Sequence, residues 1–123
     1  MKILLLGLTA AAALWAHHSM AGFDRTKTVA LEGTVQEFRW QNPHSSIEID
    51  VPGKDGQVVK WQIEMTAPSY LVRSGWKRTS IKKGDKVTIV GNPLLSGDPG
   101  ALFVSIKLAN GETLPPPRGG KSK

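Results

Sequence analysis

The chain has 123 residues, of which 40% are hydrophobic and 21% are charged, and it contains 13 glycines, 8 prolines and no cysteine. This length and the many turn residues suit one small globular domain and exclude an architecture of long helices. The lack of cysteine excludes disulfides and a lipidated N-terminal cysteine. The net charge of +6 favours anionic partners.

The first sixteen residues differ from everything that follows. Met1 and Lys2 form a short positive region, an apolar run of thirteen residues extends from Ile3 to Trp15, and Ala16 is a small residue suited to cleavage. Such a run is too short to span a bilayer as a helix but is typical of a secretory signal peptide. An uncleaved anchor or a buried core segment is the alternative. We expect a periplasmic or secreted protein with no transmembrane segment in its mature form.

Two cleavage sites compete. A cut after Ala16 leaves His17 and His18 at the start of the mature chain, whereas a cut after Ala21 removes both histidines. Small residues at both recognition positions, Ser19 and Ala21, favour the second site on pattern alone.

Residues 28–40 predict a long first strand that bends. Apolar side chains occupy odd positions up to Val35 and even positions from Phe38 onward, and one face can be kept through that change only with an extra residue near Gln36 and Glu37. This pattern is typical of a β-bulge, which bends and twists a strand. A strongly coiled first strand is what a small closed barrel needs.

A corner follows the first strand. Pro43 fixes its own φ angle and disfavours helix at Asn42, so residues 40–44 are expected to turn tightly. The corner holds His44, the only histidine outside the extreme N-terminus, and places it near a strand end. It is a candidate site.

Alternating apolar residues at 47–51 and 59–65, separated by a turn rich in Pro and Gly, predict a hairpin of the second and third strands. A short helix is expected next, with Thr66 as its N-cap and Gly75 as a left-handed C-terminal cap.

Residues 81–91 predict a turn followed by the fourth strand. Leu102, Val104, Ile106 and Leu108 alternate and predict the fifth strand.

Three strands, a short helix and two further strands resemble the OB-fold. The predicted fold is an all-β, five-stranded antiparallel barrel with one short helix between the third and fourth strands, and an open antiparallel sandwich is the alternative. The resemblance covers residues 28–109. The expected organisation is a signal peptide (1–16), an N-terminal arm (17–27), the barrel domain (28–110) and a disordered basic tail rich in Pro and Gly (111–123).

Three histidines form the first candidate site. A chain that begins at His17 offers a free α-amine and an imidazole, which together can chelate copper or zinc, and His18 or His44 can complete the site. The alternative is that the early histidines belong to a processing segment and that His44 only satisfies local backbone groups.

A basic cluster around a tryptophan forms the second candidate site. Basic residues and aromatic rings can make a binding groove in OB-folds, and in an exported protein nucleic acid is an unlikely ligand. Anionic envelope components, namely lipid head groups or polysaccharide, are the expected partners, besides an envelope protein. The alternative is a solvated basic face with the tryptophan packed on the helix end. The candidate ligand-binding residues are Trp40, Asn42, Arg73, Trp76, Lys77, Arg78, Lys82 and Lys83.

No signature of catalysis is present. The sequence has no cysteine nucleophile, no Gly-x-Ser-x-Gly elbow and no glycine loop for phosphate. The acidic residues of the strands occur singly. The sequence therefore gives no support to an enzyme.

The motifs together resemble a family of small exported bacterial proteins of unknown function. The residues that carry the resemblance are His17, His18, Ser19 and Asp24; Leu31, Gly33 and Val35; Trp40, Asn42, Pro43 and His44; Trp61 and Glu64; Gly75, Trp76 and Arg78; and Gly84, Asp85 and Val87. The resemblance implies that the His-His-Ser start belongs to the mature protein, which favours the cut after Ala16. This chain departs from the family pattern directly after Glu64, where relatives tend to be richer in glycine and serine. We expect an exported, non-catalytic binding or accessory protein.

Overall fold

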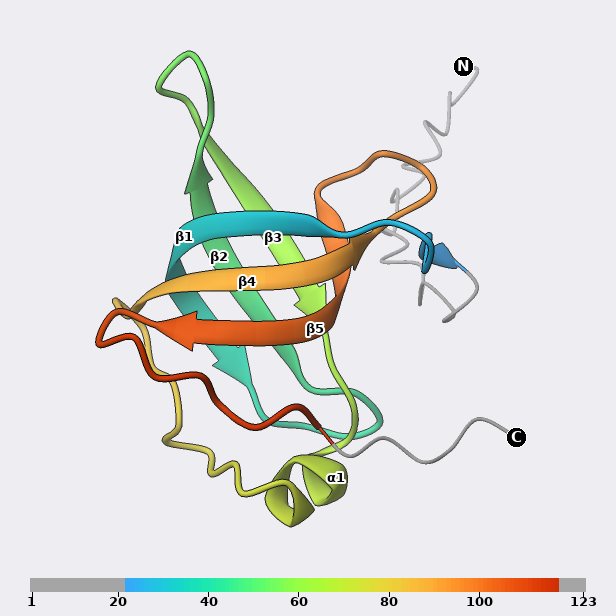
Figure 1. Ribbon diagram of the computed structural model, residues 1–123, viewed down its shortest axis with the longest axis vertical. Coiled ribbons are helices and arrows are strands. Elements are labelled where there is room, and N and C mark those ends of the chain that lie inside the picture. Colours follow the sequence, from blue (N-terminus) through green and yellow to red (C-terminus); the bar gives the residue numbers. More distant parts are fainter. Residues whose placement is uncertain (1–21, 118–123) are drawn as a thin grey trace, which may run out of the picture.

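The computed structural model describes residues 22–117. Its elements are β1 (Val29–Arg39), β2 (Ser46–Pro52), β3 (Val58–Glu64), α1 (Pro68–Arg73), β4 (Lys86–Pro93) and β5 (Gly100–Leu108) (Figure 1). The strands close into a barrel in the order β1-β2-β3-β5-β4, with the helix between β3 and β4. This arrangement confirms the predicted OB-like barrel. One pair differs from the antiparallel expectation, because residues 62–64 of β3 and 100–102 of β5 run in parallel.

A bulge bends β1 where the apolar pattern changes phase. Val35 pairs with Ile49 and Glu37 pairs with Glu48, so Gln36 is the extra residue. Val35 on one side of the bulge is buried, and Phe38 on the other side packs against the same core. The predicted bulge is therefore confirmed. The bent strand pairs with β4 through its first half and with β2 through its second half, which lets five short strands close.

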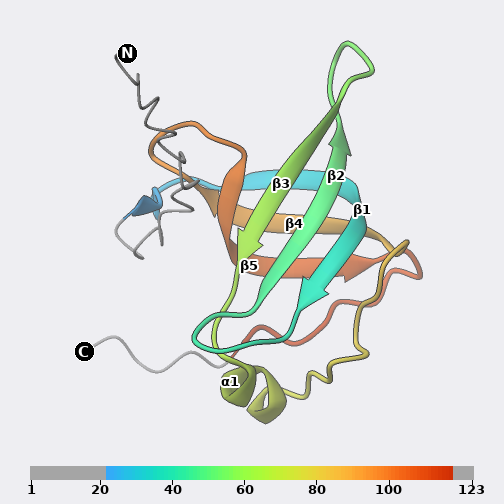
Figure 2. The ribbon, with the colours of Figure 1, turned by 180° about the vertical axis from the view of Figure 1, so that it is seen from behind.

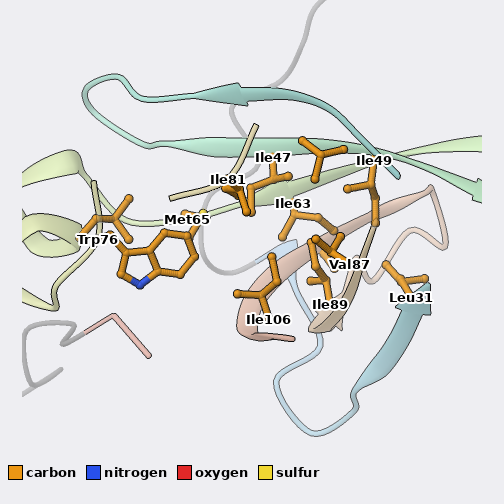
Figure 3. Packing of buried hydrophobic residues seen from close by; sticks show 13 residues of the cluster. Leu31, Ile47, Ile49, Ile63, Met65, Trp76, Ile81, Val87, Ile89 and Ile106 are labelled. Atoms are coloured by element: carbon orange, nitrogen blue, oxygen red, sulfur yellow. The ribbon is translucent and has the colours of Figure 1, made fainter. Parts of the chain in front are cut away.

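The core fills the barrel and continues beneath one of its ends. Branched aliphatic side chains from all five strands meet inside, as expected for strands with one buried face (Figure 3). Residues of α1 and of the segment after it extend this cluster. The members are Leu31, Val35, Ile47, Ile49, Ile63, Met65, Leu71, Trp76, Ile81, Val87, Ile89, Ala101 and Ile106.

Helix α1 lies below one end of the barrel and ends as predicted (Figure 1). Gly75 has a φ of 96°, and the two bonds that follow, from Gly75 N–H to the Val72 carbonyl (3.0 Å) and from Trp76 N–H to the Leu71 carbonyl (2.9 Å), form a Schellman motif. The start of the helix differs from the prediction. The N-cap is Ala67 with no side-chain bond, so Thr66 is not the cap.

Strand β5 contains a second irregularity that its sequence pattern hides. Gly91 of β4 pairs with Phe103, and Val90 pairs with Ser105, so Val104 is an extra residue. Its side chain is 40% exposed. Strict alternation would place Val104 on the same face as Ile106, but the bulge turns it outward and brings Phe103 against the core instead.

The chain after β5 packs on the barrel, so the predicted disorder from residue 111 onward begins too early. Thr113 forms a bridge with Lys107, and the Leu114 N–H donates to the Ile106 carbonyl at 3.3 Å. Leu114 also packs against the core cluster. This segment lies along β5 where that strand has separated from β3, and it covers part of the open edge. Within residues 22–117 no helix has the length and apolar character needed to cross a membrane.

Candidate functional site

A groove of about 630 Å³ beside β3 is lined by residues of two loops and of the start of the described chain. The ribbons of these segments lie on one side of the barrel (Figure 2). One loop joins β1 to β2, and the other joins β4 to β5. In OB-folds these loops and the face of the second and third strands form the usual ligand site. The groove is lined by Phe23, Arg39, Gln41, Pro43, His44, Ser45, Ser46, Lys60, Gln62, Ile63, Glu64, Leu94, Asp98, Pro99 and Gly100.

The β1–β2 corner is fixed at both ends and exposed in the middle. Trp40 packs edge-on against Phe38, with ring centroids 5.7 Å apart. At the other end Ser45 is buried, donates its N–H to the Thr66 carbonyl at 3.0 Å, and extends the β2–β3 pairing by one step. His44, between these anchors, is exposed and lines the groove.

The two other predicted ligand residues of this corner have different positions. Trp40 is half-buried against the core, and Asn42 is exposed, joined to Pro43 by a cis peptide bond. Neither lines the groove, whereas Gln41 and Pro43 do. The sequence therefore located the corner correctly, but the structure selects different side chains to face the cavity.

The start of the described chain forms the opposite wall. Phe23 is 6% exposed and pairs with Leu94 of the β4–β5 loop. Backbone bonds hold it on both sides, from the Asp24 N–H to the Pro93 carbonyl (2.8 Å) and from the Leu95 N–H to the Gly22 carbonyl (2.9 Å). The N-terminal segment is thus attached beside the groove that contains His44.

The predicted metal ligands are divided between the described and the undescribed parts of the chain. His17 and His18 lie outside the described residues. Residues 22–117 contain no group of three or more His, Cys, Asp or Glu side chains that could hold a metal ion. A metal site of three or more such ligands at His44 would therefore include ligands from outside residues 22–117.

A network of charges spans the outer side of β1, β2 and β3 at the edge of the groove. The Glu48 carboxylate lies 3.0 Å from Lys60 Nζ and 3.5 Å from an Arg39 nitrogen, and it accepts a 2.8 Å hydrogen bond from Gln62 Nε2. The bond from Lys60, aided by that from Gln62, lowers the pKa of Glu48, although burial opposes the shift. The same contact raises the pKa of Lys60.

This network holds three groove residues, Arg39, Lys60 and Gln62, in fixed positions. Sequence analysis did not identify it as part of a site. The signal was available, because the predicted hairpin places Glu48 opposite Gln62 with an outward-facing lysine close by, and such cross-strand pairs interact.

One buried hydroxyl in the groove wall has no partner among the described residues. Ser45 is fully buried, and its Oγ makes no hydrogen bond there. An unpaired buried hydroxyl is costly, which makes this atom notable.

The predicted basic cluster lies away from this groove. Arg73, Lys77, Arg78, Lys82 and Lys83 are exposed, none lines the groove, and no ion pair joins them to any residue within 22–117.

Trp76 does not share the exposure of these cations. It is 2% exposed, packs against Phe38 and Phe103, and donates Nε1–H to the Pro115 carbonyl at 2.7 Å. The structure therefore places it in the core, as in the alternative of a tryptophan packed beneath the helix end, and not on a binding surface.

The fold and the position of the groove define the protein as an OB-like barrel. A crystal structure of a mitochondrial single-stranded DNA binding protein from S. cerevisiae, Rim1, is similar, with a TM-score of 0.52 and 16% sequence identity over 68% of this chain and 93% of that chain. At this identity the similarity concerns the fold alone. Residues 5–103 match the family of unknown function DUF6152, and the chain belongs to that family. A comparison with curated proteins finds no match.

Proposed function

We propose that this OB-like protein is an exported binding protein that holds a transition-metal ion, copper in the first place, at the mouth of the groove between its β1–β2 and β4–β5 loops. The ligands are the α-amine and imidazole of His17 in a chain cut after Ala16, together with His18 and His44. The observation that supports this best is the shared groove wall. His44 and Phe23 line the same cavity, and Phe23 follows the two early histidines by only a few residues.

The length of chain between Gly22 and His17 bears on this proposal. Extended backbone covers about 3.3–3.6 Å per residue, so a segment from Gly22 back to His17 can extend about 17 Å. Gly22 is itself fixed to the β4–β5 loop by the bond from Leu95. The segment therefore starts at the wall of the groove that also contains His44, with about 17 Å of extended chain between Gly22 and His17.

The donor set determines the preferred metal. Imidazole and amine nitrogens suit copper and zinc, and in the order of divalent affinities copper stands above zinc. His44 is exposed, so its imidazole can rotate toward an incoming ion without opening the core.

The groove has little in common with a nucleic-acid site. Binding of single strands uses a positive groove and exposed aromatic rings on which bases stack. Here the two basic side chains, Arg39 and Lys60, are matched by two acidic ones, Glu64 and Asp98. Phe23, which supplies the phenyl ring in the lining, is only 6% exposed and forms a backbone bridge with Leu94. The similarity to Rim1 therefore does not bring DNA binding to this chain.

Copper titration of the secreted protein tests the proposal. The intact mass should show a mature chain that begins at His17. This protein should bind one Cu(II) with a visible d–d absorption band, and binding should release protons because amine and imidazole ligands must lose theirs.

Three variants separate the ligands. A chain that begins at Gly22 and the His17→Ala variant should lose the tight site. His44→Ala should bind at least about tenfold more weakly, as expected for loss of one ligand or its orienting contacts. Gln41→Ala, in the same corner, is the matched control and should bind as the unaltered protein does. Tight binding by the chain that begins at Gly22 would refute the N-terminal site, and unchanged binding by His44→Ala would remove the groove from it.

A further inference from the structure

The charges of the described chain are divided between two regions. Residues 65–86, which comprise α1 and the segment leading to β4, carry six cations and one carboxylate, a net charge of +5. The other described residues carry six cations and nine carboxylates, a net charge of −3. The charge of the described chain is therefore distributed unevenly, with one basic region and an acidic remainder, which the overall composition does not reveal.

The basic region is built so that its cations project outward. Buried Trp76 and Ile81 fix the segment to the core, and Lys77, Arg78, Lys82 and Lys83 lie on either side of Ile81 with exposed side chains. The single carboxylate of the region, on Asp85, accepts a bond from the Lys82 backbone N–H at 3.0 Å. It therefore serves the turn, and no ion pair within residues 22–117 neutralises the cations.

Exposed apolar side chains lie beside these cations on α1. Tyr70 is 38% exposed and Val72 is 59% exposed, although both belong to a short helix that could have buried them. The Arg73 guanidinium lies over the Tyr70 ring, 5.8 Å from its centroid. Tyr70 and Val72 lie on either side of buried Leu71. An aromatic ring, an aliphatic side chain and several cations within one short stretch of chain are typical of segments that rest on the head-group region of a membrane.

We infer that α1 and the segment to residue 86 form a docking surface for an anionic phospholipid bilayer, with Tyr70 and Val72 entering the head-group layer and the lysines and arginines contacting the phosphates. Charge complementarity identifies the partner as anionic. The exposed Val72 favours a bilayer over a soluble polyanion, because an aliphatic side chain gains only where it leaves water. The inference is independent of the metal site.

The geometry gives the protein a defined orientation on such a surface. Helix α1 lies at one end of the molecule, and the turn of the β2–β3 hairpin lies at the opposite end (Figure 1). The region also lies beside the point where the chain leaves the barrel, since Trp76 bonds to Pro115. Three more cations, Arg118, Lys121 and Lys123, follow Pro115 in the sequence and lie outside the described residues.

Sedimentation with vesicles tests this surface. The secreted protein should bind vesicles of phosphatidylcholine mixed with phosphatidylglycerol and should not bind vesicles of phosphatidylcholine alone. Raising the salt concentration should release it, because the screening length falls from about 10 Å at 0.1 M to about 3 Å at 1 M.

A double charge variant and a single valine variant test the surface, and each has a matched control elsewhere on the barrel. Each basic side chain near an anionic leaflet contributes about fivefold to partition, so Lys82→Gln with Lys83→Gln should weaken binding about 25-fold. Lys54→Gln with Arg25→Gln removes the same charge elsewhere and should change binding by no more than about twofold, since those charges are screened from the surface. Val72→Ser should weaken binding about three- to tenfold, whereas Val58→Ser, at a valine that is 62% exposed, should not.

The outcomes distinguish binding through this surface from binding that depends on net charge alone. Equal losses in the two charge pairs would show that net charge and not this surface governs binding, and would overturn the inference. The inference would also be wrong if Val72→Ser left vesicle binding unchanged and the protein bound dextran sulfate as tightly as it binds vesicles. That result would indicate a site for soluble polyanions in place of a bilayer site. Absence of binding to phosphatidylglycerol vesicles would also overturn it.

The His17→Ala variant should bind vesicles normally, so failure of the metal proposal leaves this measurement unaffected. The lysine, arginine and valine variants alter exposed side chains, and thermal unfolding should confirm that each is folded.

Discussion

Replacing Trp76 with phenylalanine tests whether this residue stabilises the core. Its indole contacts the rings of Phe38 and Phe103, at centroid distances of 6.1 and 5.7 Å, and donates a 2.7 Å hydrogen bond to Pro115. Phenylalanine keeps a ring in place but removes that bond, which is worth about 0.5–1.5 kcal/mol net, and two buried ring carbons at about 0.8 kcal/mol each. The free energy of unfolding should therefore fall by about 2–3 kcal/mol.

Urea unfolding followed by circular dichroism measures the effect. With an m-value of about 1–3 kcal/mol/M for a domain of this size, the midpoint should move down by about 1 M or more. Trp61→Phe is the control, because Trp61 is half-buried and its ring nitrogen bonds to no residue within 22–117. It should show a clearly smaller loss. A midpoint for Trp76→Phe equal to that of the unaltered protein would refute the core assignment, and vesicle binding should survive the change because the indole is not at the surface.

Three further substitutions test the groove and the barrel. Glu48→Gln should lower the free energy of unfolding by about 1–2 kcal/mol at neutral pH. Because the folded pKa of this carboxyl lies below its ordinary value of 4.5, the stabilisation is complete above that value and is lost as the pH falls through the folded pKa, so unfolding curves of the two proteins should converge in acid. Ser45→Ala should raise stability by about 1 kcal/mol, since it removes a buried hydroxyl without a partner, and a decrease in urea midpoint would show that the hydroxyl is satisfied. Gly91→Ala should destabilise by about 1–3 kcal/mol in a thermal melt, because a Cβ there would lie 2.8 Å from that of Ala101, and an unchanged melting temperature would contradict that crowding.

Only one part of the candidate site could be predicted from the sequence. The corner at residues 40–44 was predictable, because proline chemistry and the change of periodicity are local signals. The cavity beside it was not, because its other walls come from Phe23 and Leu94, which are brought together by pairing across the barrel. No local pattern marks two distant segments as neighbours.

The basic cluster also shows that local sequence does not determine which side chains are buried by distant contacts. Its exposed cations were identified from composition alone, yet Trp76, which lies among them in the sequence, is turned inward by the left-handed conformation at Gly75 and by the bond to Pro115. The sequence could place the glycine at the helix end. It could not show which side chains the resulting turn would direct into the core.

The alternation of apolar residues determined by itself which strands exist, where β1 bulges and that one short helix interrupts them, since side-chain direction in a strand follows from its period of two. The tertiary structure decided the parallel closure of β3 with β5, the outward turn of Val104, the packing of Leu114 and the separation of a near-neutral groove from a basic surface. Each of these depends on contacts between residues far apart in the chain, where closing the barrel selects one pairing among several that the local sequence allows equally well.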